Sequence, residues 1–356
     1  MSPSRSPGSV AVKQSADFIH KVRRYGIQGD LAVWIQNWLA DRRQRVVVDG
    51  KYSAWRSLLS GGPQGSVLGP LLFVVFINDL DEEVEGRVSM FADDTKVGGA
   101  IDSIEGYCTL QRDIDSMQRW AEKWQMEFNL DKCEVMHFGR SNLNAEYRIK
   151  GRILGSVEEQ RDLGVQVHSS LKVPTQVDKV VKKAYGVLAF INRGIEFKSR
   201  EVMLQLYKTL VRPHLEYCVR FWSPYYRKDV EALERVQRRF TRMLPGLEGL
   251  SYEERLTELG LFSLERRRKR GDLIKVYKIM RGMGRVDSQR PFPRAGLTAT
   301  RGHSFKVLGG RYRGDVRGTF FTQRVVSAWN TLPVVVVEAE SLVTFKRLLD
   351  NAHGQQ

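Results

Sequence analysis

Two aspartates stand side by side in the segment SMFADDTKVGG, between an apolar run and a pair of glycines. The strand-like residues on either side predict a β-hairpin with Asp93 and Asp94 at its tip. Phe91, Ala92 and Val97 have the character of interior residues, yet two adjacent carboxylates repel each other and are costly to bury. Two interpretations follow: either a cation sits beside the acids, or the tip is a solvated turn.

Nucleotidyl transfer is a chemistry that uses such a pair of acids. Two divalent metal ions about 3.5–4 Å apart, held by carboxylates, activate the attacking hydroxyl and stabilise the leaving pyrophosphate. Mg²⁺ prefers oxygen ligands and takes few protein donors beside phosphate oxygens. Adjacent acids on a rigid hairpin suit this role, although pairs of aspartates are also common in turns that only face water.

A glycine-rich loop precedes the acidic hairpin. The segment SGGPQGSVLGPLLFVVFINDL, residues 60–80, predicts a flexible loop that leads directly into a buried helix. Gly62 and Gly65 let the backbone approach a ligand closely, while Gln64 offers an amide and Ser66 a hydroxyl. An ordinary loop at the start of a helix explains this segment in isolation. Beside the acidic hairpin, a nucleotide-binding loop explains it better.

A strongly basic charge balance restricts the partners of the chain. Its 356 residues include 57 Lys and Arg against 41 Asp and Glu, which gives a formal net charge of +16. Such a surplus favours a polyanionic partner, nucleic acid first and an anionic membrane surface second. The longest apolar stretch, residues 67–77, is too short to span a bilayer and contains Pro70, so we expect no membrane span.

The cysteines and the first residues indicate an intracellular protein, in the nucleus or the cytoplasm. Cys108, Cys133 and Cys218 are well separated, so they match neither a zinc spacing nor a disulfide framework. The opening MSPSRSPGSV is polar and basic, which is unlike a signal peptide, and we expect it to be disordered. The sequence leaves the oligomeric state open.

The predicted elements divide the chain into a mixed α/β part and a helical part that begins near residue 171. Asp49 and Gly50 predict the turn of a further hairpin, and EVMHFG and RDLGVQV predict two short strands. Three segments show apolar residues at helical spacing. These are Leu31, Trp34, Ile35, Trp38 and Leu39; Leu110, Ile114, Met117, Ala121 and Trp124; and Leu233, Val236, Phe240 and Leu244. Arg235, Arg238 and Arg242 line another face of the third segment.

The loop and the acidic hairpin together resemble the reverse transcriptases of non-LTR (LINE-type, jockey-like) retrotransposons. That family has G-x-P-Q-G-S before a hydrophobic helix and then F/Y-A-D-D, which stand here as GGPQGSVLGPLLF and FADD. Further similar segments are WQMEFNLDKCEVMHFG, RDLGVQV and FFTQRVVSAWNTLP. The resemblance runs from about Phe18 to the end of the chain.

The resemblance implies a role for each matching residue. Asp93 and Asp94 would be catalytic and would bind Mg²⁺, or Mn²⁺ in its place. Phe91 would pack beside the primer terminus. The segment of Gly62, Pro63, Gln64, Gly65 and Ser66 would contact the incoming deoxynucleotide and the template base, with Gln64 as the central contact.

Two further contacts are implied downstream of the hairpin. Lys132, which follows Asn129 in the motif FNLDK, would lie near the nucleotide phosphates and protonate the pyrophosphate, although a plain surface lysine is the alternative. Arg235, Arg238 and Arg242 would grip the phosphates of the RNA template and DNA primer from a helical thumb.

The region before KVRRYG departs from the family pattern. The family has an acidic motif there, F-D-x-V-x-H, whose aspartate bridges both metals. Residues 11–18 of this chain are AVKQSADF, and Asp17 lies too close to Tyr25 to take that role without a shift. The fingers domain and the upstream endonuclease of the family have no counterpart in the sequence. The chain therefore resembles a fragment of a degraded element, and we expect it to polymerise little or nothing.

Other candidate residues have a simpler structural explanation. His137 and His214 lack Cys or His partners at metal spacing, so we expect packing or capping roles. Trp120 and Trp124 fall on a helical core stripe, with base stacking as the alternative. The run RRRKR, residues 266–270, fits a solvated helix face, a phosphate contact or a nuclear address equally well.

The sequence therefore predicts an α+β fold. We expect a non-homologous start over 1–17, a truncated polymerase palm with an antiparallel sheet over 18–170, a basic helical thumb over 171–285 and a small C-terminal extension over 286–356. The expected function is that of an RNA-directed DNA polymerase domain of a retrotransposon, impaired because the first catalytic aspartate motif is absent. A non-catalytic nucleic-acid-binding remnant is the alternative.

Overall fold

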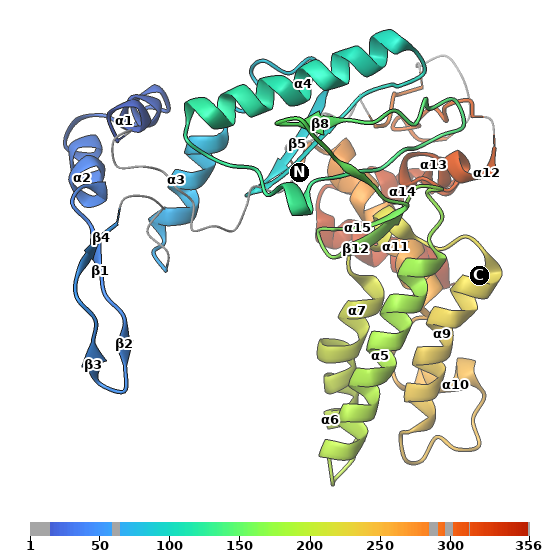
Figure 1. The fold of residues 1–356 in the computed structure, drawn as a ribbon. Coiled ribbons are helices and arrows are strands. Elements are labelled where there is room, and N and C mark those ends of the chain that lie inside the picture. The colour runs from blue at the N-terminus through green and yellow to red at the C-terminus, as the bar shows by residue number, and fades with distance from the viewer. Residues whose placement is uncertain (1–14, 59–64, 285–290, 296–301, 313, 355–356) are drawn as a thin grey trace. The chain divides into compact units, whose positions relative to one another are not determined.

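The structure is a computed structural model that describes residues 15–58, 65–284, 291–295, 302–312 and 314–354. The chain divides into two compact units, Met1–Glu158 and Glu159–Gln356. Both units mix helices with short strands, as the α+β class predicts (Figure 1). The expected start over 1–17 lies almost wholly outside the described residues, and the palm, thumb and extension ranges stay predictions.

In its described residues, the first unit contains four α-helices and a set of short strands. The helices are α1 (Ser15–Arg24), α2 (Gly29–Leu39), α3 (Leu68–Ile77) and α4 (Ile104–Lys123). The strands are β1 (Arg43–Gln44), β2 (Val47–Val48), β3 (Lys51–Tyr52), β4 (Arg56–Ser57), β5 (Arg87–Phe91), β6 (Asp94–Gly98), β7 (Glu134–Val135), β8 (Arg148–Ile149), β9 (Arg152–Ile153) and β10 (Gly155–Ser156). Among the described residues these strands form separate two-stranded ladders, and all of them are antiparallel except the ladder of β7 with β10. The sequence had instead predicted a palm built on an antiparallel sheet.

Helix α4 organises the core of this unit. Its expected stripe is buried: Ala121 and Trp124 pack with α1 and α3, Met117 packs with the end of α3, and Ile114 packs with Tyr147 beside β8. Ser103 begins the helix, because its side chain accepts a hydrogen bond from the backbone N–H of Gly106. Trp120 and Trp124 are therefore core residues, as the helical spacing predicts.

The predicted face of α2 is wrong in part. Ala32 and Ile35 are buried, whereas Leu31 and Trp34 are exposed on the other side of the helix. The side chain of Trp34 stacks on Trp38 at 5.8 Å between ring centroids. The five apolar residues cover more than one helix face. Ile35 is buried in the cluster with α1 and α3, Trp38 and Leu39 pack partly against it, and Leu31 and Trp34 lie outside it.

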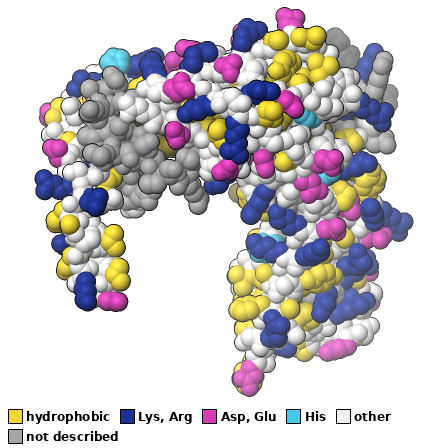
Figure 2. All heavy atoms as spheres, in the orientation of Figure 1, with side chains coloured by type: hydrophobic (Ala, Val, Ile, Leu, Met, Phe, Trp, Pro, Cys, Tyr) yellow, Lys and Arg dark blue, Asp and Glu magenta, His cyan; other side chains and the backbone are white. Residues whose placement is uncertain are grey.

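Strands β1 to β4 form a ribbon that confirms the hairpin predicted at Asp49 and Gly50. Both residues have positive φ, 48° and 76°, which is the conformation of a two-residue turn that matches strand twist. Val47, Val48 and Tyr52 of the ribbon are exposed, although three consecutive valines at 46–48 are typical of a buried strand. Figure 2 shows both apolar and basic side chains on the surface of this ribbon.

The second unit begins with a hairpin and continues in helices. The elements are β11 (Glu159–Asp162), β12 (Val165–His168), α5 (Pro174–Gly194), α6 (Arg200–Leu206), a π-helical turn (Tyr207–Val211), α7 (Arg212–Glu216), α8 (Val219–Trp222), α9 (Arg227–Arg242), α10 (Tyr252–Glu258), α11 (Leu264–Met280), α12 (Asp315–Gly318), α13 (Phe321–Asn330), α14 (Val334–Val337) and α15 (Leu342–Gly354). RDLGVQV was predicted as one strand, but it contains a turn. Leu163 and Gly164 both have positive φ and separate β11 from β12.

Two apolar clusters form the core of the second unit. One gathers α5, α6, α7, α9 and α10, and it buries the predicted stripe of Leu233, Val236, Phe240 and Leu244. The other gathers the end of α11 with α13, α14 and α15. In the described part of the chain, no helix combines the length and the apolar character that a bilayer span requires.

The basic run at 266–270 is mostly structural. Arg267 pairs with Glu216 and Arg270 pairs with Asp350, so the run connects α11 to α7 and to α15. Arg268 is buried, Lys269 pairs with Glu265 one turn back, and Arg266 lies over the ring of Phe262. Each basic residue of the run is therefore buried or contacts another residue of the unit. None of the three interpretations of the sequence had assigned the run such a structural role.

Candidate functional site

The acidic pair lies at the tip of the hairpin formed by β5 and β6, as predicted. Phe91 pairs with Asp94, which leaves Ala92 and Asp93 as the two turn residues. Ala92 has a φ of 51°, in the left-handed region that a tight turn requires. Both aspartates are half-buried, and the carboxylate of Asp93 has no hydrogen bond or ion pair among the described residues.

The two faces of this hairpin differ, because side chains alternate along a strand. Met90 and Val97 lie on the inner face and pack against α3 and α4. Phe91 and Lys96 lie on the other face and are exposed. Phe91 was expected to be an interior residue, but it is 62% exposed, since its register places it opposite to Met90.

Helix α4 holds the start of the hairpin through one buried carboxylate. Asp113 accepts hydrogen bonds from the backbone N–H groups of Glu85, at 2.9 Å, and Gly86, at 3.0 Å. A Cβ at Gly86 would lie 2.7 Å from Oδ2 of Asp113, so only glycine fits there without a shift. The tip therefore stands on strands whose position is set by α4, although Asp113 carries no motif that marks it in the sequence.

A buried ion pair positions α3, the helix that follows the glycine-rich loop. Nζ of Lys21 on α1 lies 2.6 Å from Oδ1 of Asp79 and 2.8 Å from the carbonyl oxygen of Phe76. The ammonium group lies 3.5 Å from the ring centroid of Trp124, and Trp120 donates its indole N–H to the same Asp79 oxygen. Burial lowers the pKa of Lys21, and the bond to Asp79 opposes that shift.

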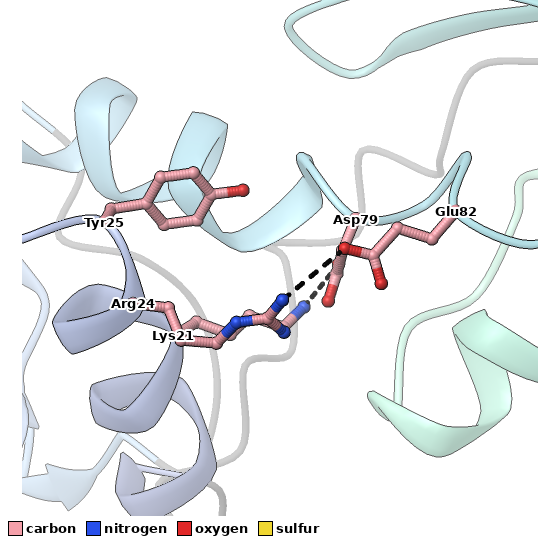
Figure 3. A pocket seen from close by; sticks show the side chains of 5 residues that line it. All are labelled: Lys21, Arg24, Tyr25, Asp79 and Glu82. Atoms are coloured by element: carbon pink, nitrogen blue, oxygen red, sulfur yellow. Dashed lines mark hydrogen bonds and ion pairs between the residues drawn. The ribbon is translucent and has the colours of Figure 1, made fainter.

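A small cavity of about 120 Å³ lies beside this ion pair. Figure 3 shows Lys21 and Arg24 pointing from α1 toward Asp79 and Glu82, with Tyr25 at the side. Two cations face two anions there, so the charges already balance and the cavity has no excess of either sign. We assign it to the structural support of α1 and α3.

The glycine-rich loop is described only at its end. The predicted contacts Gly62, Pro63 and Gln64 lie outside the described residues. Gly65 has a φ of 78°, which favours glycine, and the hydroxyl of Ser66 accepts a hydrogen bond from the backbone N–H of Gly69 at 2.9 Å. Gly65 and Ser66 thus lie just before α3, and Ser66 binds a backbone N–H of its first turn. Their contact with a nucleotide stays a prediction.

The remaining predicted site residues are accessible. Lys132 is exposed in the 3₁₀ turn Leu130–Lys132 and forms no ion pair with a described carboxylate. The side chain of Asn129 begins this turn by accepting the backbone N–H of Asp131. On α9, Arg235, Arg238 and Arg242 are exposed opposite the buried stripe.

Two neighbouring carboxylates suit a magnesium ion that also takes phosphate oxygens and water. Mg²⁺ is commonly held by one or two carboxylates together with substrate phosphates, so Asp93 and Asp94 fit that donor set. Within the described ranges, however, no group of three or more His, Cys, Asp or Glu side chains could hold a metal ion. His137 and His214 are both half-buried, and Nδ1 of His137 lies 3.1 Å from the side-chain oxygen of Asn142.

Comparisons with known proteins give similarities for the segment that contains the loop and the hairpin. A family described as reverse transcriptase (RNA-dependent DNA polymerase) matches residues 14–177, which contain the loop and the acidic hairpin. This part of the chain is therefore similar to a reverse transcriptase domain. The chain is also similar to RNA-directed DNA polymerases of the jockey mobile element.

Three relatives show these similarities. The RNA-directed DNA polymerase from the mobile element jockey of Drosophila melanogaster is 25% identical over 225 residues, which cover 60% of this chain. Its counterpart from Drosophila funebris is 27% identical over 229 residues, also 60% of this chain. A probable RNA-directed DNA polymerase from transposon BS of Drosophila melanogaster is 24% identical over 225 residues, 59% of this chain. The matched segments span 25% of the length of each relative.

Proposed function

We propose that the hairpin of β5 and β6 is the metal-binding part of a polymerase palm that adds deoxynucleotides to a DNA primer on an RNA template. The observation that carries the proposal is that Asp93 and Asp94 are both half-buried at the hairpin tip. Asp93 is the second residue of the turn, and Asp94 directly follows it as the first residue of β6. Two carboxylates at that point are held by strands rather than by a mobile loop, which suits a site that must position charge.

Each neighbouring residue has a role in this proposal. Asp93 and Asp94 would hold Mg²⁺ or Mn²⁺, which would stabilise the negative charge of the leaving pyrophosphate. The exposed ring of Phe91, paired with Asp94 across the hairpin, would pack beside the primer terminus. Gly65 and Ser66, with the preceding residues 62–64, would contact the incoming nucleotide, and the exposed ammonium of Lys132 would donate a proton to pyrophosphate.

We further propose that the polypeptide synthesises DNA poorly. Residues 11–14, where the family pattern places a bridging aspartate, are AVKQ and hold no acid. Two carboxylates without the bridging one would hold at least one metal ion weakly, and metal positioning supplies much of the rate in such sites. The proposed place of action is the nucleus or the cytoplasm, which suits the free Cys108, Cys133 and Cys218.

Primer extension by the purified chain tests both parts of the proposal. An oligo(dT) primer on poly(rA) is extended with Mg²⁺ or Mn²⁺, and Asp93→Asn and Asp94→Asn are compared with Glu134→Gln, which removes an exposed acid of the same unit. We expect weak extension that either aspartate variant abolishes and Glu134→Gln preserves. Extension that survives Asp93→Asn rejects the site, and vigorous Mg²⁺-dependent synthesis by the unmodified chain rejects the impairment.

A role as a nucleic-acid-binding protein without catalysis is the second candidate. The exposed Arg235, Arg238 and Arg242 on α9 favour it, together with the net charge of +16. The ribbon of β1 to β4 adds a second basic and aromatic surface, where Arg45 lies 4.0 Å from the ring centroid of Tyr52 and 4.6 Å from that of Trp55.

The salt dependence of binding distinguishes this candidate. If the α9 arginines contact phosphates, the affinity for an RNA–DNA duplex falls steeply with salt, and each arginine replaced by glutamine lowers the log–log slope by about one. Arg227→Gln, which removes the same charge from a fully accessible position of α9, is the matched control. An unchanged slope in the triple variant of Arg235, Arg238 and Arg242 rejects the role of this surface.

A further inference from the structure

Two segments that carry the family resemblance have no part in the acidic hairpin. RDLGVQV contains the turn between β11 and β12, and FFTQRVVSAWNTLP covers α13 and its flanks. The structure brings both segments, with α8, to the walls of one cavity of about 280 Å³ in the second unit. A cavity of this size is at the lower end of the range for small-molecule sites.

Half of the second segment builds the core and the other half lines the cavity. Val325, Trp329 and Leu332 are buried in the apolar cluster of α11, α13, α14 and α15. Phe320 and Phe321, at the start of α13, line the cavity and remain half-exposed. The ring of Phe321 also packs against the cluster, 5.6 Å from the ring of the buried Phe292. Phe321 thus belongs to both the core and the cavity wall, whereas Phe320 is not among the residues that pack against this cluster.

Arg324 fixes the walls of the cavity relative to one another. Its guanidinium donates to the carbonyl oxygen of Thr319 at 3.0 Å, to that of Arg220 at 2.9 Å and to both oxygens of Asp272. These bonds join α13, α8 and α11, so the cavity is a feature of the packed unit and not of one loop.

The wall that α8 contributes carries an accessible aromatic ring. Phe221 is 65% exposed, while its neighbour Trp222 is buried and donates its indole N–H to the carbonyl oxygen of Tyr217. An exposed phenylalanine beside Phe320 and Phe321 offers flat apolar surface to a ligand. Aromatic rings of this kind stack on nucleobases without regard to sequence.

The charge of the cavity is positive. Lys172, Arg220 and Arg317 line it and are exposed, and none of the three forms an ion pair with a described carboxylate. Among the described residues that line the cavity, none is acidic. The guanidinium of Arg317 lies 5.0 Å from the ring centroid of Phe320, so one cation stands directly beside an aromatic wall. A ligand that fits is flat, apolar and anionic at one end.

We propose that this cavity binds an unpaired nucleobase together with its phosphate, either as a free nucleotide or as one nucleotide of a single strand. The aromatic walls would stack on the base, and Lys172, Arg220 and Arg317 would contact the phosphate. The site is distinct from the acidic hairpin, and its occupation does not require that the hairpin be catalytic.

Crosslinking of the full chain locates the ligand. The probe is a short oligouridine that carries 4-thiouridine, irradiated with the protein and mapped by mass spectrometry. We expect crosslinks in the peptides that contain Phe221 or Phe320, and the Asp93→Asn variant leaves them unchanged. Competition by free uridine monophosphate assigns the site to a nucleotide, whereas competition by unlabelled oligouridine alone assigns it to a strand. The absence of crosslinks in both peptides overturns the proposal.

Fluorescence anisotropy with a matched abasic oligonucleotide separates base recognition from phosphate contact. Phe221→Ala should weaken binding of the oligouridine about tenfold and leave binding of the abasic strand unchanged. Arg220→Gln should weaken both and lower the salt slope by about one. The controls are Phe197→Ala, which removes an aromatic ring that is 84% exposed and does not line the cavity, and Arg227→Gln. If Phe221→Ala affects both strands equally, or neither, the cavity does not bind a base.

Discussion

The guanidinium of Arg324 makes two hydrogen bonds to the carboxylate of Asp272, at 2.9 Å from Nε and at 3.1 Å from Nη2. Both side chains are largely buried, and the same guanidinium also donates to two backbone carbonyl groups. One side chain from α13 thus donates hydrogen bonds to a buried carboxylate on α11 and to the backbone carbonyl groups of Thr319 and Arg220. The pair links the core of the C-terminal helices to the cavity beside them.

Loss of Arg324 should destabilise the second unit. Arg324→Met leaves the carboxylate of Asp272 buried without its partner, and we expect the free energy of unfolding to fall by about 3 kcal/mol. Urea unfolding followed by tryptophan fluorescence measures the change. Lys269→Met removes an exposed ion pair on the same helix as Asp272, and it should cost less than about 1 kcal/mol. Equal effects of the two variants would contradict a structural role for the buried pair.

Asp229, in the first turn of α9, should make the stability of the second unit depend on pH. Burial raises the pKa of Asp229 above 3.8, the neighbouring Lys228 opposes the shift, and Asp178 adds to it. Its Oδ2 atom is buried without a hydrogen-bond partner. Because the folded pKa is raised, the stabilising contribution is complete below pH 3.8 and is lost as the pH rises through the folded pKa.

Asp229→Asn removes this titration. The free energy of unfolding of the variant, relative to the unmodified chain, should therefore increase as the pH rises from below 3.8 toward neutrality. Urea titrations over a pH series provide the measurement, with Glu231→Gln, an exposed acid on the same helix, as the control. A difference that stays constant with pH, or decreases, is incompatible with a raised pKa.

Lys21 should be essential for the first unit, although it belongs to no catalytic motif. Lys21→Met leaves the carboxylate of Asp79 with only the indole N–H of Trp120, and we expect a loss of about 3 kcal/mol in the free energy of unfolding. Arg24→Met, on the same helix but exposed and 4.0 Å from Glu82, should change the stability by less than about 0.5 kcal/mol. Thermal unfolding monitored by circular dichroism compares the two, and a silent Lys21→Met would refute the assignment.

Gly86 should tolerate no side chain. The Cβ of Gly86→Ala would lie 2.7 Å from Oδ2 of Asp113 and 3.1 Å from the carbonyl oxygen of Gly98, so we expect a loss of about 1–3 kcal/mol. Gly155→Ala is the matched control, since nothing lies within 4 Å of a Cβ there. Hydrogen exchange of β5 and β6 reports the effect at the hairpin. Unchanged protection in Gly86→Ala would show that α4 does not hold the hairpin start.

Local patterns predicted the elements of the candidate site well. Apolar residues on both sides of Asp93 and Asp94 predict the hairpin, and Asp49 with Gly50 predicts the turn of the ribbon, because strand and turn preferences act between neighbours in the chain. RDLGVQV was the exception among the short strands. Its turn depends on a leucine with positive φ, and leucine gives no signal for that conformation.

Long-range contacts explain what local patterns missed. Arg267 contacts Glu216 at a separation of 51 positions, and Arg324 contacts the backbone of Arg220 at a separation of 104. A run of arginines looks the same in the sequence whether its charges face water or pair with distant acids, and an apolar ring such as Phe221 looks like a core residue until the packing leaves it exposed. Periodicity and turn chemistry therefore predicted the acidic hairpin, while the resemblance to reverse transcriptases came from the motifs around it. The buried ion pairs and the cavity exist only because folding brings distant residues into contact, where desolvation and charge decide which groups pair.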